Sequence, residues 1–363
     1  MSYVGYVLIA VLVLLVMITV HEFGHYVAGK IFGFGIDEFA IGFGPKLFSK
    51  RKKDGELFSI RLLPIGGFCA FRGEDEQSDD PRAFNNKKPW QRIIVLISGA
   101  LMNYLLAILL IIIMFSAWGQ PALMTYKVQP PPENVSVENC LYERDVIVKA
   151  NGKNVYLVTD LMNAVSNKQS GEVVPFEVVR NGKRVQFNLI LRQDTDFKNV
   201  EEMIKLYDAL GIEYQTDTET GALTGVGLYS TWLKQGFFST IGKSFEYSFK
   251  LAGTIFTVLG QLITGALGIG SLGGTVTTIA VTADAIKIGG LRYLLNISSL
   301  IGVNLAVFNL LPFPALDGSR VVFTGIEWIR RKPINRRVEA IIHGIGLVLL
   351  LVFAVFVDLQ RCF

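Results

Sequence analysis

Long stretches without a charged side chain are the feature that most constrains this chain. Ile93 to Trp118 runs for 26 residues and Leu251 to Ala283 for 33 residues without a charge, and Tyr3 to Val20 adds a further 18. About 20 such residues let an α-helix cross the hydrocarbon core of a bilayer. Over all 363 residues 51% are hydrophobic and only 18% are charged, which is too apolar for a soluble protein. The sequence therefore predicts a membrane protein with several helical spans.

The basic residues indicate which loops face the cytoplasm. From Lys46 to Arg92 the chain has 11 lysines and arginines against seven acidic residues, and a second basic cluster runs from Arg330 to Arg337. An excess of Lys and Arg in short loops marks the cytoplasmic side, so an even number of crossings separates the two clusters. Spans at Ile93–Trp118 and Tyr293–Leu316 already supply two. We therefore expect the glycine-rich stretch Leu251–Ala283 to be interfacial or re-entrant, which leaves four spans with both termini outside.

These assignments divide the chain into consecutive segments. They are residues 1–35, the first span; 36–92, a cytoplasmic-side loop with a membrane-dipping β-hairpin; 93–118, the second span; 119–235, an extracytoplasmic domain; 236–290, an interfacial or re-entrant Gly-rich helical segment; 291–330, the third span; and 331–363, a basic loop and the fourth span. The predicted fold class is a polytopic α-helical membrane protein with a membrane-associated β-hairpin or sheet and an inserted α+β domain.

The first span ends in a pattern that carries chemistry, His21-Glu22-Phe23-Gly24-His25. On a helix the two histidines lie one turn apart on the same face, so both imidazoles can reach one zinc ion. Glu22 is then placed to take a proton from a water, which is the work of a general base in peptide hydrolysis. The alternative, from the motif alone, is a pair of polar residues at the membrane interface.

Leu57 to Phe71 reads as strand, with Pro64 and the Gly66-Gly67 pair as punctuation. An apolar hairpin with no sheet to join is costly unless it packs against the spans, so we place it in the membrane beside the HExxH helix. Its unpaired edge could then accept an extended peptide as an added strand. The alternative is a surface hairpin that binds nothing.

Composition changes abruptly after the second span. Tyr126 to about Tyr229 is polar and rich in short alternating stretches such as Val146–Val148 and Phe176–Val179. Asn181-Gly182 predicts a tight turn between Phe176–Val179 and Val185–Leu189. Roughly a hundred residues is the size of one small soluble domain.

A carboxylate near the other end of the chain completes the metal pattern. Asp317 follows the breaks at Pro312 and Pro314, which puts it at the same cytoplasmic-side depth as His21 and His25 under the topology above. A carboxylate within the bilayer costs about 2.5–3.5 kcal/mol on insertion scales and is usually paired or functional. Two imidazoles, one carboxylate and a water make the usual open catalytic zinc site. The alternative is that Asp317 caps the helix that follows.

At this point the chain resembles the site-2 protease family of intramembrane zinc metalloproteases, particularly its bacterial members with an inserted PDZ domain. The resemblance covers nearly the whole length. The stretches that carry it are His21 to His25, Gly42-Phe43-Gly44-Pro45, Pro64-Ile65-Gly66-Gly67, and Asn309 to Gly318 read as NxxPxPxLDG. The chain departs from the family pattern at Ser319 and Arg320, where glycine and histidine are common, and at Ala100, where proline is frequent.

The resemblance implies a role for each matching residue. By that likeness His21, His25 and Asp317 bind Zn2+, and Glu22 activates the water. The residues expected to hold or line the path of the substrate are Gly66, Gly67, Phe68, Asn304, Asn309, Pro312 and Pro314. Residues 119–235 would form one PDZ-like domain that captures peptide ends, filters by size or docks a partner.

The likeness predicts an intramembrane zinc endopeptidase of the bacterial plasma membrane. Its expected substrate is a single-span membrane protein already trimmed on its outer side, such as an anti-sigma factor or a signal-peptide remnant. The net charge of +4 resides in loops beside apolar runs, so the expected partners are this substrate and the lipid bilayer, and not nucleic acid. Two other functions stay open: a non-catalytic scaffold that binds partners through the PDZ-like domain, and a membrane-anchored zincin that cuts cytoplasmic loops.

Overall fold

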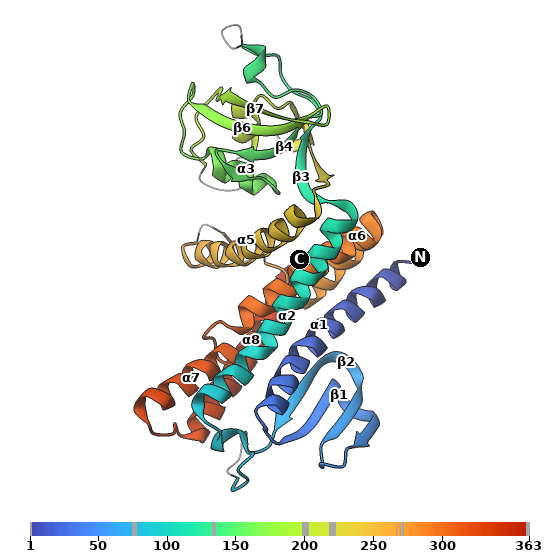
Figure 1. The fold of residues 1–363 in the computed structure, drawn as a ribbon, viewed down its shortest axis with the longest axis vertical. Helices are drawn as coiled ribbons and strands as arrows, with labels where there is room; N and C mark the ends of the chain where they lie inside the picture. The colour runs from blue at the N-terminus through green and yellow to red at the C-terminus, as the bar shows by residue number, and fades with distance from the viewer. Residues whose placement is uncertain are drawn as a thin grey trace. The chain divides into compact units, whose positions relative to one another are not determined.

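The long uncharged stretches of the sequence are largely helical in the structure (Figure 1). The structure is a computed structural model that describes residues 2–74, 78–132, 136–197, 203–217, 223–265, 267–268, 270 and 272–360. The chain forms two units, of which the first comprises Met1–Met114 and Ser244–Phe363 and the second Phe115–Lys243. The long helices are α1 (Tyr3–Ile31), α2 (Pro89–Trp118), α5 (Phe237–Ile263), α6 (Thr275–Asn309), α7 (Asp317–Arg330) and α8 (Arg336–Gln360).

Within the described ranges, four helices are long and apolar enough to cross a membrane, the number that the sequence predicts. They are α1, α2, α6 and the Arg337–Gln360 part of α8. The helix α5 is not among them, and its first half carries Lys243, Glu246 and Lys250. This chain is therefore an integral membrane protein whose crossing segments are helices, because a helix satisfies its own backbone hydrogen bonds in lipid.

The third span differs from its predicted limits. The expected glycine-rich helical segment 236–290 is divided between α5 and the start of α6, because the glycines between them interrupt the helix. The backbone of α6 breaks at Gly290, with φ 59° and ψ −141°, which is the predicted start of the third span. The helix of this span stops a few residues before the predicted limit Leu316, at the break expected from the two prolines. It ends at Asn309, and Asp317 begins the separate helix α7, because Pro312 and Pro314 cannot continue a helix.

The segment of residues 36–92 holds a two-stranded sheet of β1 (Ile36–Arg51) and β2 (Leu57–Phe71). The sequence predicts β2 but misses β1, because Gly42 and Gly44 read as breaks. Both glycines have positive φ, 84° and 85°, and let β1 bend without ending it. The expected punctuation at Gly66-Gly67 is not a turn: the pair lies inside β2 and the hairpin turns over residues 52–56.

The sheet curls so that one part of β1 is central. Residues 38–41 pair with residues 67–70 of β2 and also with residues 57–60. Residues 67–70 thus pair with β1 along one side, and no third strand of the described chain joins them along the other. The helix α1 packs against both β2 and α6, which holds this edge beside the first span.

The second unit is an α+β domain. Its strands are β3 (Gln120–Thr125), β4 (Val146–Ala150), β5 (Lys153–Asn154), β6 (Val173–Arg180), β7 (Lys183–Ile190), β8 (Tyr214–Thr216), β9 (Leu223–Val226) and β10 (Leu228–Leu233), and its helices are α3 (Val158–Val165) and α4 (Met203–Leu210). The main sheet has the order β10-β3-β4-β6-β7, with β5 paired to β4. The turn at Asn181-Gly182 is confirmed, with φ of 51° and 77° and Arg180 paired with Lys183. The PDZ-like identity of this domain stays a prediction.

A buried ion pair ties α2 to α7 in the first unit. The Arg92 and Glu327 side chains are 5% and 7% exposed, and Nη1 of Arg92 donates to Oε2 of Glu327 over 2.6 Å. Oε1 of Glu327 also accepts the Ile334 backbone N–H at 2.9 Å. The Arg92 guanidinium lies 5.3 Å from the centre of the Phe84 ring. Removing one partner would leave the other charge buried without its counter-charge.

We therefore expect Arg92→Met to lower the free energy of unfolding by about 3–5 kcal/mol. The double variant Arg92→Met/Glu327→Leu, which removes both charges, should recover much of that loss. Unfolding in detergent micelles, followed by circular dichroism, measures both. The exposed pair of Arg82 with Asp80 is the matched control, and Arg82→Ala should cost at most about 1 kcal/mol. Equal losses from Arg92→Met and Arg82→Ala would contradict the role given to burial.

Candidate metal centre

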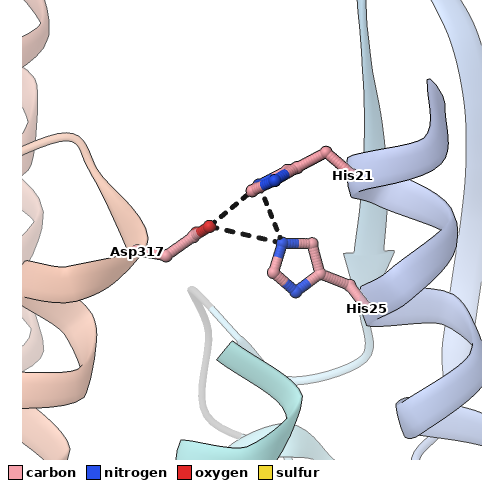
Figure 2. Close-up of side chains that lie close together, drawn as sticks. All are labelled: His21, His25 and Asp317. Atoms are coloured by element: carbon pink, nitrogen blue, oxygen red, sulfur yellow. Dashed lines mark hydrogen bonds and ion pairs between the residues drawn. The ribbon is translucent and has the colours of Figure 1, made fainter. Parts of the chain in front are cut away.

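Two imidazoles project from successive turns near the end of α1 (Figure 2). His21 and His25 are each only 7% exposed, and their ring centres lie 4.8 Å apart with the planes at 84°. The spacing of four residues places both rings on one face of the helix, as the sequence predicts. A buried imidazole needs a partner for each of its polar nitrogens, so the surroundings of the four nitrogens decide what the pair can do.

Asp317 reaches the same point from almost three hundred residues away (Figure 2). The chain turns into α7 through Ala315, which has the left-handed φ of 79° and donates its N–H to Nδ1 of His343 at 3.1 Å. A Cβ at Gly318 would lie 2.3 Å from the Leu310 carbonyl oxygen, so only glycine lets the start of α7 lie this close to the preceding turn. In the Asp-Gly pair of the motif, Asp317 thus faces the histidines, and Gly318 lets the start of α7 lie close to Leu310.

The three side chains converge on one point. Oδ2 of Asp317 lies 2.9 Å from Nε2 of His21 and 3.4 Å from Nε2 of His25, and the two Nε2 atoms are 3.2 Å apart. Ligand atoms about 2.0–2.1 Å from a tetrahedral zinc lie about 3.3 Å from one another. The donor set and its spacing therefore fit zinc with a fourth position left for water.

One face of α2 forms the floor of this centre. A Cβ on Gly99 would lie 2.3 Å from Nε2 of His25 and 2.9 Å from Cε1 of His21. One turn earlier, the Val95 carbonyl lies 2.8 Å from Nδ1 of His25 and accepts its proton, which leaves Nε2 of that ring free to act as a ligand. The helices α1 and α2 approach closely here because Gly24, on α1, has no side chain to meet the Ser98 carbonyl.

Glu22 lies beside the edge of β2. The backbone of Cys69 hydrogen-bonds to the Glu22 carboxylate, and a Cβ on Gly67 would lie 3.6 Å from Cγ of Glu22. Glu22, His25 and Asp317 line a cavity of about 520 Å³ together with residues 68–71 of β2. The Glu22 carboxylate, two of the three predicted metal ligands and an edge strand thus line one cavity.

The residues predicted to contact substrate are distributed unevenly. Phe68 lines the cavity and Gly67 lies next to Glu22, whereas Gly66, with φ of 106°, packs over the Phe43 ring. The others do not line the cavity. Asn304 is in α6, and Asn309 is the last residue of that helix. Pro312 and Pro314 are in the segment before α7, and Pro314 packs against Gly346 of α8. Their roles, and those of the proposed ligands and base, stay predictions.

The two departures after the LDG triplet have local roles. Ser319 is buried, and its hydroxyl donates to the Leu316 carbonyl at 2.8 Å, as a residue of the first turn of a helix commonly does. Arg320 lines the cavity and forms an ion pair with Glu74, which follows β2. Neither residue displaces Asp317. Sequence reasoning misses the contribution of Val95, because a backbone carbonyl leaves no signal in the residue type.

Comparison with known proteins agrees with this geometry. A family model described as Peptidase family M50 matches residues 9–353. Over 361 residues the chain is 32% identical to a Clostridium perfringens protein whose name assigns it to the zinc metalloproteases, with 98% of each chain covered. It is 28% identical over 425 residues to zinc metalloprotease RasP of Geobacillus kaustophilus, with 94% of this chain and 95% of that protein covered. The range matched by the family model contains His21, His25 and Asp317.

The floor of the centre gives a test. Gly99→Ala places a methyl group against both imidazoles, so we expect the purified protein to hold well under half the zinc of the wild type while its helix content is unchanged. Metal analysis of the purified protein measures this. Gly325→Ala on α7 is the control, since a Cβ there meets no described atom within 4 Å. Full zinc content in Gly99→Ala would contradict the packing described here.

Proposed function

Because this chain belongs to peptidase family M50, the site-2 protease family of zinc metalloendopeptidases, we propose that it cleaves peptide bonds inside membranes. The substrate would be a single-span membrane protein already trimmed on its outer side, cut within its transmembrane helix. One observation carries the proposal: His21 and His25, near the end of a membrane-crossing helix, meet Asp317 beside an edge strand.

The chemistry divides between the metal and the chain. His21, His25 and Asp317 would hold the zinc, which would supply activation of a water and compensation of the negative charge that develops on the scissile carbonyl oxygen. The Glu22 carboxylate takes the proton from that water and then gives it to the leaving amine nitrogen, so the proton ends on the new amino terminus. The Val95 carbonyl keeps the His25 ring in one orientation throughout.

The edge of β2 supplies what the substrate needs. A membrane helix hides its carbonyls in internal hydrogen bonds, so the scissile bond must first be unwound. Residues 67–70 of β2 pair with β1 on one side only, and residues 68–71 line the cavity with Glu22 and Asp317. An extended substrate added to this edge would exchange its helical hydrogen bonds for strand hydrogen bonds. Its carbonyl would then lie next to the metal ligands.

Two contacts support the proposed topology, with both termini and residues 119–235 on the outer side. The pair of Arg92 and Glu327 joins the start of α2 to α7, and both residues lie close to the basic clusters. A second contact joins the start of α6 to the end of α8, at the ends that lie away from the basic clusters. There the Asp358 carboxylate accepts the N–H groups of Val276 and Thr277 at 3.0 and 3.1 Å. The two basic clusters therefore lie at one end of the first unit, as one cytoplasmic face requires.

The base assignment is tested by Glu22→Gln. We expect this variant to keep its zinc and its association with substrate, and to lose about 10²–10⁴-fold in cleavage rate, because the amide cannot take a proton. Metal analysis, co-purification and cleavage of a single-span substrate measure the three properties. Wild-type turnover would refute the assignment. His21→Ala should instead lose zinc, and if neither wild type nor His21→Ala holds metal, the non-catalytic scaffold is favoured.

The place of cleavage separates the proposal from the membrane-anchored zincin. We expect mass spectrometry of the products to find new termini inside the apolar segment of the substrate, because residues 68–71, His25 and Asp317 line one cavity near the end of a span. Glu22→Gln, incubated in parallel, controls for contaminating proteases. New termini in an aqueous loop with the helix intact would contradict intramembrane cleavage.

A further inference from the structure

The two histidines have different partners on the nitrogen that points away from Asp317. An imidazole that gives the Nε2 lone pair to a metal carries its proton on Nδ1, and this proton needs an acceptor. For His25 the acceptor is the Val95 carbonyl, 2.8 Å away. For His21 the hydrogen-bond partner of Nδ1 is the side-chain amide of Asn103, with its Nδ2 at 3.5 Å. The orientation of His21 therefore depends on a side chain.

Asn103 continues the face of α2 that already serves the centre. Val95, Gly99 and Asn103 follow one another at intervals of four residues, so they lie on one side of the helix. Asn103 is 0% exposed, and its Oδ1 has no hydrogen-bond partner in the part of the chain that the structure describes. A buried amide oxygen without a donor has lost its hydrogen bonds to water and gained none in return. A 180° rotation of the Asn103 carboxamide exchanges the positions of its oxygen and nitrogen with almost no change of shape.

We propose that Asn103 is a positioning residue for the metal centre: its carboxamide oxygen accepts the Nδ1 proton of His21 and so holds Nε2 toward the metal. The inference rests on the proposed zinc site. The inference gives a donor to Oδ1 of Asn103, the side-chain atom that has no partner in the described chain. It also gives an acceptor to the His21 ring, which, unlike His25, has no backbone carbonyl on Nδ1 among the described residues. Val95 and Asn103, about two turns apart on the same face of α2, would then fix one ring each.

A packing role for Asn103 makes a different prediction. The Asn103 backbone carbonyl lies 3.3 Å from where a Cβ on Gly302 would stand, so this turn of α2 also contacts α6. Leucine and aspartate both match the size of asparagine, but only aspartate can accept a hydrogen bond from Nδ1–H of His21. If Asn103 positions His21, Asn103→Asp should keep the zinc and Asn103→Leu should lose it. If Asn103 only packs, the apolar leucine should be tolerated at least as well as a buried carboxylate.

The experiment measures zinc affinity on the intact protein in detergent, by competition with a chromophoric chelator, and the absorption spectrum of the cobalt-substituted form. We expect Asn103→Leu and Asn103→Ala to weaken zinc binding by about 10–100-fold and to change the cobalt spectrum. Asn103→Asp should bind zinc at least as tightly as the wild type. Asn296→Leu, at a half-buried asparagine of α6, is the control and should match the wild type.

The outcomes are distinct. Wild-type zinc affinity in both Asn103→Leu and Asn103→Ala overturns the inference while the proposed protease stands. Equal weakening in the Asp and Leu variants, together with lower unfolding temperatures in both, overturns it in favour of packing. A wild-type protein that binds no zinc overturns the proposed function itself, whatever the variants do.

Discussion

The close approach of α1 to α2 is the constraint on which the rest of the site depends. Gly24 of α1 lies against the Ser98 carbonyl, and Gly99 of α2 lies beneath the imidazoles. A side chain at either glycine would clash with the other helix. Lipid chains are as apolar as leucine, so helices in a bilayer gain from tight packing at small residues more than from hydrophobic burial. The glycines thus supply both helix association and space for His21 and His25.

The third ligand depends on a different device. Asp317 is not carried by a crossing helix, because α6 ends at Asn309 and a short irregular segment intervenes. That segment is fixed by the left-handed Ala315, whose N–H is held by His343 on α8, and by the contact of Gly318 with Leu310. Such local strain persists only where the surroundings over-determine it. The carboxylate is therefore positioned by backbone contacts that the site itself does not use.

Sequence reasoning reaches the parts of this structure that have a local cause. Uncharged length locates the spans, a four-residue spacing pairs His21 with His25, and Asn181-Gly182 specifies a tight turn. It fails where the cause is tertiary. Strand β1 bends at Gly42 and Gly44 and is held by its pairing with β2, so its own residues do not predict it. The convergence with Asp317 could be expected from two motifs together, but the contacts from α2 could not.

Under the proposed reaction, cleavage takes place where the surroundings are less polar than water. Electrostatic interactions are stronger in such surroundings than in bulk solvent. A substrate helix must lose several internal hydrogen bonds before its carbonyl can approach the ligands, and the free edge of residues 67–70 offers hydrogen bonds in return. Under the proposed reaction the cost of unwinding is thus what distinguishes substrates. Segments with glycine or proline unwind at lower cost than segments of leucine and alanine, so under the proposed reaction a substrate whose helix contains such residues would be cut faster than one whose helix lacks them.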